Sequence, residues 1–212
     1  MKDFTFEKLN IEGLFIVNPF YAEDGRGYFL KSYEKEIFRK AGIETDIFED
    51  FESWSRKNVI RGLHFQTMKP QSKLVRAVYG EIFDVAVDIR RESPTFGQWR
   101  GVHLSGENHK ALFIPGGFAH GFLVLSDTAL VSYKCSGQYL KECDTGIPWN
   151  DPDIGVEWPL ESLENVIVSE RDQGFTPLKC KIMEMGGVNP RIYHSNVALI
   201  ILVHLLRRCA RK

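Results

Sequence analysis

Two short segments each place a histidine beside glycines in a β-type run: residues 61–66 (RGLHFQ) and residues 114–122 (IPGGFAHGF). Glycine inside a strand marks a bulge or the close approach of a ligand. Histidine is the side chain whose charge changes near neutral pH. His64 and His120 therefore indicate a pocket with a candidate base.

Cations accompany His64 in the sequence, because Arg61, Lys73 and Arg76 all fall within one predicted hairpin. An imidazole suits the removal of a proton at neutral pH, and a fixed cation can stabilise the anion that this removal forms. The set therefore favours proton abstraction next to a carbonyl group. The competing interpretation is a core histidine that is simply hydrogen-bonded within a barrel.

Three further residues have two interpretations each. Tyr133 is by itself only a strand aromatic, and it gains interest only if it lies beside His64. Asp172 could orient an imidazole or could be an exposed loop acid. Arg26, in the glycine-flanked turn of residues 24–29 (DGRGYF), could bind a phosphate or only be solvated.

A metal site is not favoured by the histidine spacing. Metal-binding β-barrels commonly use two histidines in an HxH pair, but residues 64–66 read His-Phe-Gln, and His103, His109 and His120 form no pair two residues apart. The sequence therefore predicts a pocket without metal and without a cofactor.

The elements that must position these residues are mostly strands. Residues 83–89 (FDVAVDI) alternate in polarity, and glycines interrupt residues 58–139 about every ten residues, as in a β-sandwich or barrel. Residues 32–41 are predicted to form a short peripheral helix that ends at Gly42. Residues 142–180 are predicted to form an irregular wrap whose tryptophans cover the barrel.

Composition limits the possible partners and location. The 212 residues are 43% apolar with a formal net charge of −1, which predicts a globular domain and no binding to nucleic acid. Four cysteines without a CxxC pair predict reduced thiols, and residues 1–7 (MKDFTFE) lack the apolar core of a signal peptide. Both features predict a cytoplasmic location.

The last 32 residues differ from the rest. Residues 181–212 hold six Lys or Arg and one acid, whereas residues 1–180 hold 21 Lys or Arg and 27 acids. The apolar run 197–203 is too short to span a membrane, which takes about 20 apolar residues. We expect a single domain over residues 1–180 and a tail of unknown role over 181–212. The tail could be a docked helix or disordered, foreign to the domain, or a helix that binds a membrane surface or a partner.

Residues 13–177 resemble the dTDP-4-dehydrorhamnose 3,5-epimerases, metal-free members of the cupin superfamily that act in nucleotide-sugar biosynthesis. The resemblance rests on several segments: residues 24–29, 58–66 (NVIRGLHFQ), 73–75 (KLV), 83–90 (FDVAVDIR), 93–97 (SPTFG), 114–122 and 149–152 (WNDP).

This resemblance implies a jelly-roll barrel, a homodimer with N-terminal strand exchange, and a 4-keto-6-deoxy sugar nucleotide as substrate. It implies that His64 is the general base, Asp172 the acid that orients it, Tyr133 the proton donor on the opposite face of the sugar, and Lys73 the enolate stabiliser. The implied substrate-binding residues are Arg26, Arg61 and His120.

The chain departs from the family at positions that help to hold the substrate. Lys31 stands where Glu is common, Asp144 replaces Glu, and Arg171 replaces Lys. Residues 49–51 (Glu49, Asp50, Phe51) replace Gln-Asp-Asn, and Gln138 replaces an aromatic residue. Gln66 is a further candidate for contact with the substrate. Loss of amide groups removes donors and acceptors that could discriminate between bases. The alternatives are therefore an epimerase of one carbon, an epimerase of a CDP- or GDP-linked deoxy sugar, and a non-catalytic or metal-dependent cupin.

One spacing raises a structural question. Arg61 and His64 are three residues apart, so a regular strand would point them to opposite faces. Either Gly62 makes a bulge that re-aims one of them, or only His64 lines the main cavity.

Overall fold

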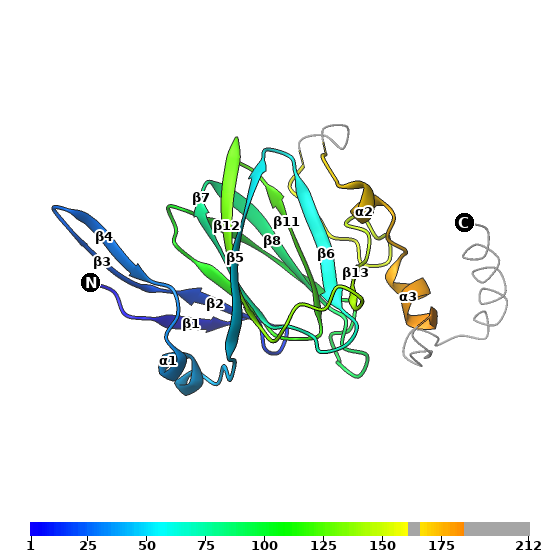
Figure 1. Ribbon diagram of the computed structural model, residues 1–212, viewed down its shortest axis with the longest axis horizontal. Coiled ribbons are helices and arrows are strands. Elements are labelled where there is room, and N and C mark those ends of the chain that lie inside the picture. Colours follow the sequence, from blue (N-terminus) through cyan, green and yellow to red (C-terminus); the bar gives the residue numbers. More distant parts are fainter. Residues whose placement is uncertain (161–165, 185–212) are drawn as a thin grey trace.

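The computed structural model describes residues 1–160 and 166–184. Two antiparallel sheets pack face to face around a common core (Figure 1). Within the described residues, the strand orders are β1-β2-β10-β7-β12-β5 and β13-β6-β11-β8-β9. The predicted all-β barrel with short peripheral helices is confirmed.

The strands of the first sheet are β1 Thr5–Lys8, β2 Phe15–Asn18, β10 Ala111–Ile114, β7 Lys73–Tyr79, β12 Thr128–Ser136 and β5 Ile47–Arg56. Those of the second sheet are β13 Asp144–Gly146, β6 Ile60–Gln66, β11 Phe118–Val124, β8 Glu81–Asp88 and β9 Trp99–Ser105. Strand β5 lies at an edge of the first sheet and pairs with β12.

Alternation along β12 shows how the sequence fills the space between the sheets. Ala129, Val131, Tyr133 and Cys135 are buried, and the residues between them are half-buried. In β8, the predicted alternating strand, both faces are covered, so that Asp84 is fully buried with its apolar neighbours. The interior of the barrel therefore contains ionisable groups as well as apolar ones.

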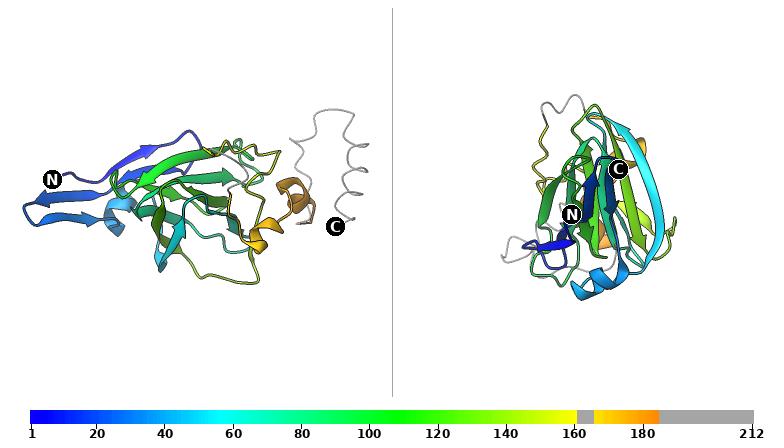
Figure 2. Two further views of the ribbon diagram at one scale, coloured as in Figure 1. Left: turned by 90° about the horizontal axis from the view of Figure 1, so that it is seen from above. Right: turned by 90° about the vertical axis from the view of Figure 1, so that its left-hand side faces the viewer.

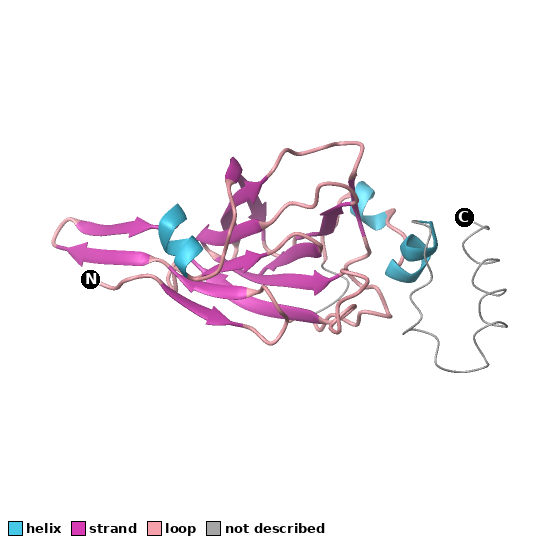
Figure 3. Ribbon diagram, turned by 90° about the horizontal axis from the view of Figure 1, so that it is seen from below, coloured by secondary structure: helices cyan, strands magenta, loops and turns pink. Residues whose placement is uncertain are grey.

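Among the described residues, three short helices lie outside the sheets (Figure 3). The predicted helix is confirmed as the shorter α1, Lys35–Lys40, and Gly42 follows it with a φ of +83°. α2 Glu170–Gln173 and α3 Leu178–Glu184 lie at the end of the barrel nearest β6 and β13 (Figure 1).

An N-terminal hairpin projects from the barrel. β3 Phe20–Asp24 and β4 Gly27–Lys31 form a separate two-stranded sheet that extends well beyond the other strands (Figures 1 and 2). Its side chains Tyr28 and Phe29 are exposed. Apolar surface on a projecting ribbon of this kind is a common mark of an interface.

The segment after β13 wraps the outer face of the second sheet. Ile147, Ile154 and Leu178 pack with Leu63 and Val85 of that sheet, and Trp158 packs against the same cluster. The Trp158 indole donates a hydrogen bond of 2.8 Å to the Trp149 carbonyl. In its described part, the predicted wrap over residues 142–180 does cover the barrel, but it is not irregular throughout, because it contains β13, α2 and the start of α3.

The cysteines fit the sequence prediction only in part. Cys135 and Cys143 are free and buried, but Cys180 is disulfide-bonded, so the prediction of four reduced thiols is wrong for Cys180. The tail prediction concerns residues 181–212, of which 185–212 lie outside the described residues. In the described part of the chain, every helix is too short or too polar to cross a membrane.

Candidate active site

His64 and Asp172 form a hydrogen-bonded pair at one end of the barrel. His64 Nε2 lies 2.9 Å from Asp172 Oδ1, and the His64 side chain keeps 29% of its surface exposed. The Phe175 ring meets the imidazole edge to face, with centroids 5.8 Å apart. A histidine that is fixed on one side and open on the other can exchange a proton with a bound molecule.

The sequence around Asp172 explains how a short helix can hold this carboxylate. Ser169 caps α2 by accepting a hydrogen bond from the Asp172 backbone N–H, and Asp172 Oδ2 accepts one from the Gly62 backbone N–H at 3.1 Å. Burial alone would raise the pKa of Asp172, but the hydrogen bonds from His64 and Gly62 hold it below its ordinary value of 3.8. Asp172 is therefore an ionised partner for the imidazole.

A bulge at Gly62 resolves the spacing question. His64 faces His120 across the β6–β11 pair, while Arg61 faces Phe122, so β6 has one extra residue there. A Cβ atom on Gly62 would lie 2.6 Å from the Gly121 Cα atom, and Gly62 has a φ of +122°. Glycine is therefore required where the two strands meet, and the bulge re-aims Arg61 relative to His64.

His64 opens into a cavity of about 480 Å³, within the size range of small-molecule sites. The lining residues come from both sheets, from the loop that precedes β7 and from the segment between β12 and α2. They are Glu49, Phe51, His64, Phe65, Gln66, Pro70, Gln71, Lys73, Phe118, Tyr139, Asp144 and Arg171. The structure thus brings together seven of the predicted residues: His64, Lys73, Glu49, Phe51, Gln66, Asp144 and Arg171.

Lys73 supplies the cation that the sequence predicted for this cavity. It begins β7 and is half-buried. Burial lowers the pKa of Lys73, and the nearby Cys135, Asp144 and Asp84 act against that shift. Arg76, the other predicted cation of β7, does not line the cavity.

Tyr133 lies behind the cavity wall. Its side chain is 7% exposed, and the Phe51 ring stacks on it with centroids 4.8 Å and planes 16° apart. The Tyr133 hydroxyl lies 3.2 Å from Ser53 Oγ. Burial raises the pKa of Tyr133, while the Ser53 hydrogen bond lowers it in part. Phe51 lines the cavity and Tyr133 does not, so the Phe51 ring lies between the phenol and the cavity.

His120 forms a second, buried pair. It is 4% exposed and does not line the cavity, and its Nε2 lies 2.8 Å from Asp84 Oδ1. Burial lowers the pKa of His120, although Asp84 acts in the opposite direction. The His120 ring also meets Tyr133 edge to face at 6.2 Å. His120 therefore supports the site from behind.

Arg61 joins the two sheets where β6 approaches β5. It is exposed, and its Nε donates to Ser55 Oγ at 2.9 Å while Nη2 donates to the Trp54 carbonyl. These bonds link β6 to the edge strand β5. Arg61 does not line the cavity, so both alternatives for the spacing question hold: the bulge is present, and of the two residues only His64 lines the cavity.

Glu49, which departs from the family pattern, and Gln66, which does not, hold residues 138–140 as a short strap beside the cavity. Glu49 accepts a hydrogen bond of 2.7 Å from the Tyr139 N–H, and the Gln66 amide binds both Leu140 N–H and the Gln138 carbonyl. Tyr139, which lines the cavity, was missed by sequence reasoning; the neighbouring departure at Gln138 was the available signal.

Two oppositely charged residues that line the cavity, Arg171 and Asp144, form an ion pair. Arg171 Nη2 lies 2.5 Å from Asp144 Oδ2, and the Tyr139 hydroxyl donates to the same oxygen at 3.0 Å. The Arg171 guanidinium also lies over the Phe175 ring. Since Phe175 contacts His64, these side chains connect the rim to the base.

Three predicted substrate contacts lie away from the cavity within one protomer. Arg26, at the tip of the hairpin, is 91% exposed and paired with Asp24. Lys31 pairs with Glu34 at 2.7 Å. Asp50 points to the opposite side of β5 from Glu49 and pairs with Lys134. The structure therefore does not gather the whole predicted set around the cavity.

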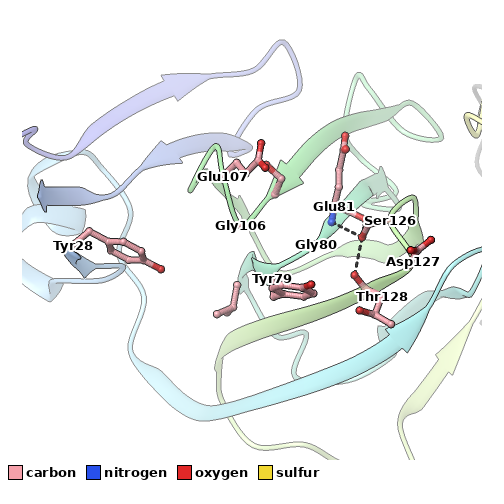
Figure 4. A pocket seen from close by; sticks show the side chains of 11 residues that line it. Tyr28, Tyr79, Gly80, Glu81, Gly106, Glu107, Ser126, Asp127 and Thr128 are labelled. Atoms are coloured by element: carbon pink, nitrogen blue, oxygen red, sulfur yellow. Dashed lines mark hydrogen bonds between the residues drawn. The ribbon is translucent and has the colours of Figure 1, made fainter. Parts of the chain in front are cut away.

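A second cavity, of about 590 Å³, lies at the turns that join β7 to β8 and β11 to β12 (Figure 4). Tyr28 and Tyr79 are part of its lining, and Ser126 binds the Glu81 N–H and the Thr128 carbonyl. Its lining includes none of the predicted site residues. The described residues also contain no group of three His, Cys, Asp or Glu side chains arranged to hold a metal ion.

Known proteins are similar to this chain over most of its length. Residues 8–179 match the family model described as dTDP-4-dehydrorhamnose 3,5-epimerase. A dTDP-4-dehydrorhamnose 3,5-epimerase of Methanothermobacter thermautotrophicus is 52% identical over 179 residues, which cover 84% of this chain and 97% of the relative.

Two solved structures are similar throughout the barrel. A dTDP-6-deoxy-D-glucose-3,5-epimerase of Legionella pneumophila, in complex with dTDP-4-keto-L-rhamnose, has a TM-score of 0.83 and 42% identity, covering 86% of this chain and 97% of the other. A 3'-monoepimerase of Streptomyces bikiniensis, in complex with dTDP-quinovose, has a TM-score of 0.77 and 32% identity, covering 84% and 89%. The fold is therefore the predicted cupin-like jelly roll, and the chain belongs to the dTDP-4-dehydrorhamnose 3,5-epimerase family of isomerases.

Proposed function

We propose that this enzyme converts dTDP-4-dehydro-6-deoxyglucose to dTDP-4-dehydrorhamnose by inverting C3 and C5. The observation that carries the proposal is the His64–Asp172 pair, which opens into a cavity that also contains Lys73. The 4-keto group of such a sugar acidifies the hydrogens on both neighbouring carbons. A positioned base and a cation are the two groups that this chemistry requires.

The proton steps follow from the hydrogen bonds. The Asp172 carboxylate accepts the Nε2 proton of His64, which leaves Nδ1 as the basic nitrogen. His64 removes the proton from C3 or C5, and Lys73 stabilises the enolate oxygen. Because the Phe51 ring lies between Tyr133 and the cavity, the proposal requires Phe51 to move aside as the sugar binds; Tyr133 then delivers a proton from the other face of the ring. A positioned base contributes about 10²–10⁴-fold to the rate, and an enolate donor about 10²–10³-fold.

The nucleotide is proposed to be bound at the rim of the cavity and by a partner subunit. Arg171, Gln66, Glu49 and Asp144 lie at or near the opening, and Arg61 lies between the sheets. Asp50 and His120 act indirectly, since Asp50 anchors the edge strand and His120 supports the wall.

The remaining contacts, Arg26 and Lys31, are proposed to act across a homodimer with N-terminal strand exchange. The exposed aromatic residues of the projecting hairpin and the open edge of β5 support this arrangement. Mixing Arg26→Ala with His64→Ala protomers tests it, because each mixed dimer would contain one intact site. We expect about a quarter of the wild-type activity after random mixing. No recovery of activity would mean that Arg26 does not act in trans.

The direct test of the reaction is NMR in D2O with dTDP-, CDP- and GDP-linked 4-keto-6-deoxyglucose. We expect inversion with deuterium at both carbons of the dTDP sugar. Deuterium at one carbon alone would favour a single-carbon epimerase, which the similarity to a 3'-monoepimerase keeps as the second candidate. No deuterium with any sugar would favour a binding protein, and loss of activity with a chelator would favour a metal-dependent cupin.

A cytoplasmic location is also proposed. The free thiols Cys135 and Cys143 support it, whereas the disulfide-bonded Cys180 does not. Cell fractionation with an antibody to the protein tests this point, and recovery outside the cytoplasmic fraction would contradict it.

A further inference from the structure

Tyr133 is enclosed on nearly every side. Phe51 stacks on one face, and Phe122 and His120 contact the ring from the interior. The side chain is 7% exposed, and burial raises its pKa. A phenolate left here after proton donation would be costly unless a donor compensates for it.

Ser53 is the residue placed to provide that donor. Its Oγ lies 3.2 Å from the Tyr133 hydroxyl, the one side-chain hydrogen bond of this phenol among the described residues. Ser53 lies on the edge strand β5 and is half-buried, so it has access to solvent. Phe51 and Ser55 lie on the same face of β5 as Ser53, but Phe51 covers the Tyr133 ring and Ser55 accepts a hydrogen bond from Arg61.

We propose that Ser53 is a positioning residue that holds the Tyr133 hydroxyl and returns its proton from solvent after each donation. The inference rests on the proposed function, because it requires that Tyr133 protonates the sugar.

The proton balance closes with water as the only other participant. The Tyr133 O–H bond breaks as the new C–H bond forms on the enolate, leaving a phenolate. Ser53 rotates and donates its proton to the phenolate, re-forming Tyr133 O–H, and Ser53 takes a proton from solvent. His64 releases to solvent the proton that it removed from the sugar, so the net change is zero.

A relay through Ser53 is needed for inversion of the sugar but not for its labelling, whereas a purely structural role of Ser53 would affect both. In D2O, His64 can return a deuteron to the face from which it took the proton, which labels the substrate without inverting it. Inversion requires Tyr133, and a second turnover requires that Tyr133 be protonated again. Loss of the relay should therefore raise the ratio of labelled substrate to inverted product.

The experiment measures this ratio by NMR for Ser53→Ala, with Ser132→Ala as the control. Ser132 is the chain neighbour of Tyr133 on β12, and its side chain lies on the opposite face of the strand. We expect the ratio of labelled substrate to inverted product to rise about ten-fold or more for Ser53→Ala and to stay unchanged for Ser132→Ala. In a Tyr133→Phe background, adding Ser53→Ala should raise the ratio no further than Tyr133→Phe alone.

A matched pair isolates the hydroxyl if Ser53→Ala does not fold. Ser53→Thr keeps the hydroxyl and Ser53→Val has the same shape without it, so Thr should behave as wild type and Val should raise the ratio. An unchanged ratio in the Ala and Val variants, or equal loss of labelling and inversion, would overturn the relay alone. A wild-type enzyme that neither labels nor inverts the sugar would instead overturn the proposed function.

Discussion

His64 and His120 lie on the neighbouring strands β6 and β11 and each pairs with an aspartate, one from α2 and one from β8, yet the surroundings of the two pairs differ. In the His64–Asp172 pair the imidazole opens into the cavity, and both carboxylate oxygens accept hydrogen bonds. In the His120–Asp84 pair both side chains are buried, and Asp84 Oδ2 has no hydrogen-bond partner among the described residues. The same two residue types thus form a base in one place and part of the wall in the other, because exposure differs.

Replacing the exposed histidine should have the largest effect. We expect His64→Ala to lower kcat by about 10²–10⁴-fold with little change in the thermal unfolding midpoint, because its main loss is a positioned base. Steady-state assays with calorimetry measure both quantities. A variant with near-normal kcat would remove the distinction between the pairs.

Replacing the aspartate of the same pair should have a smaller effect. Asp172→Asn keeps an oxygen that can accept from the Gly62 N–H but loses the charge that fixes the His64 tautomer. We expect a loss of about 10–100-fold in kcat, the usual cost of removing an orienting partner. Retention of full kcat would mean that His64 needs no orienting carboxylate.

Breaking the buried pair should act mainly on stability. Asp84→Ala leaves the His120 N–H without a partner in the interior, which costs about 1–3 kcal/mol in the free energy of unfolding. Urea denaturation measures this, with Asp84→Asn as the control because its amide oxygen can still accept from His120. Equal stability of the wild type and the Ala variant would show that the pair does not support the wall.

The two pairs should also respond to acid in different ranges, which is the smallest effect. The folded pKa of His120 lies below its ordinary 6.5, so the unfolded chain binds more protons and stability falls as the pH drops from 6.5 toward that folded pKa. The folded pKa of Asp172 lies below 3.8, so its contribution is complete above 3.8 and is lost as the pH falls through the folded pKa. Unfolding curves of His120→Gln should be flatter below pH 6.5, and those of Asp172→Asn should be flatter below pH 3.8. Identical slopes in the variants and the wild type would contradict these assignments.

The sequence predicts the strands well because their periodicity and their glycines are local properties. All of the predicted alternating run 83–89 except its last residue lies in β8, and the short helix stops just before Gly42, as predicted. The bulge at Gly62 could be predicted only as one of two alternatives, because it depends on contact with Gly121, which lies on another strand.

The site was only partly predictable. His64 and Lys73 could be found from their motifs, but the burial of Tyr133 and His120 depends on how the two sheets pack. Arg26 and Lys31 lie in the hairpin, whose place relative to a cavity cannot follow from spacing along one chain. Tyr139 was missed because its place depends on hydrogen bonds that Glu49 and Gln66 accept from the backbone of the strap.

The most direct test of the central claim is the rate of deuterium incorporation at C3 and C5 of the dTDP sugar, measured for wild type, His64→Ala and His120→Ala. We expect incorporation at both carbons to be abolished in His64→Ala and only reduced in His120→Ala. Wild-type incorporation by His64→Ala, or abolition of incorporation in His120→Ala alone, would contradict the assignment of His64 as the base.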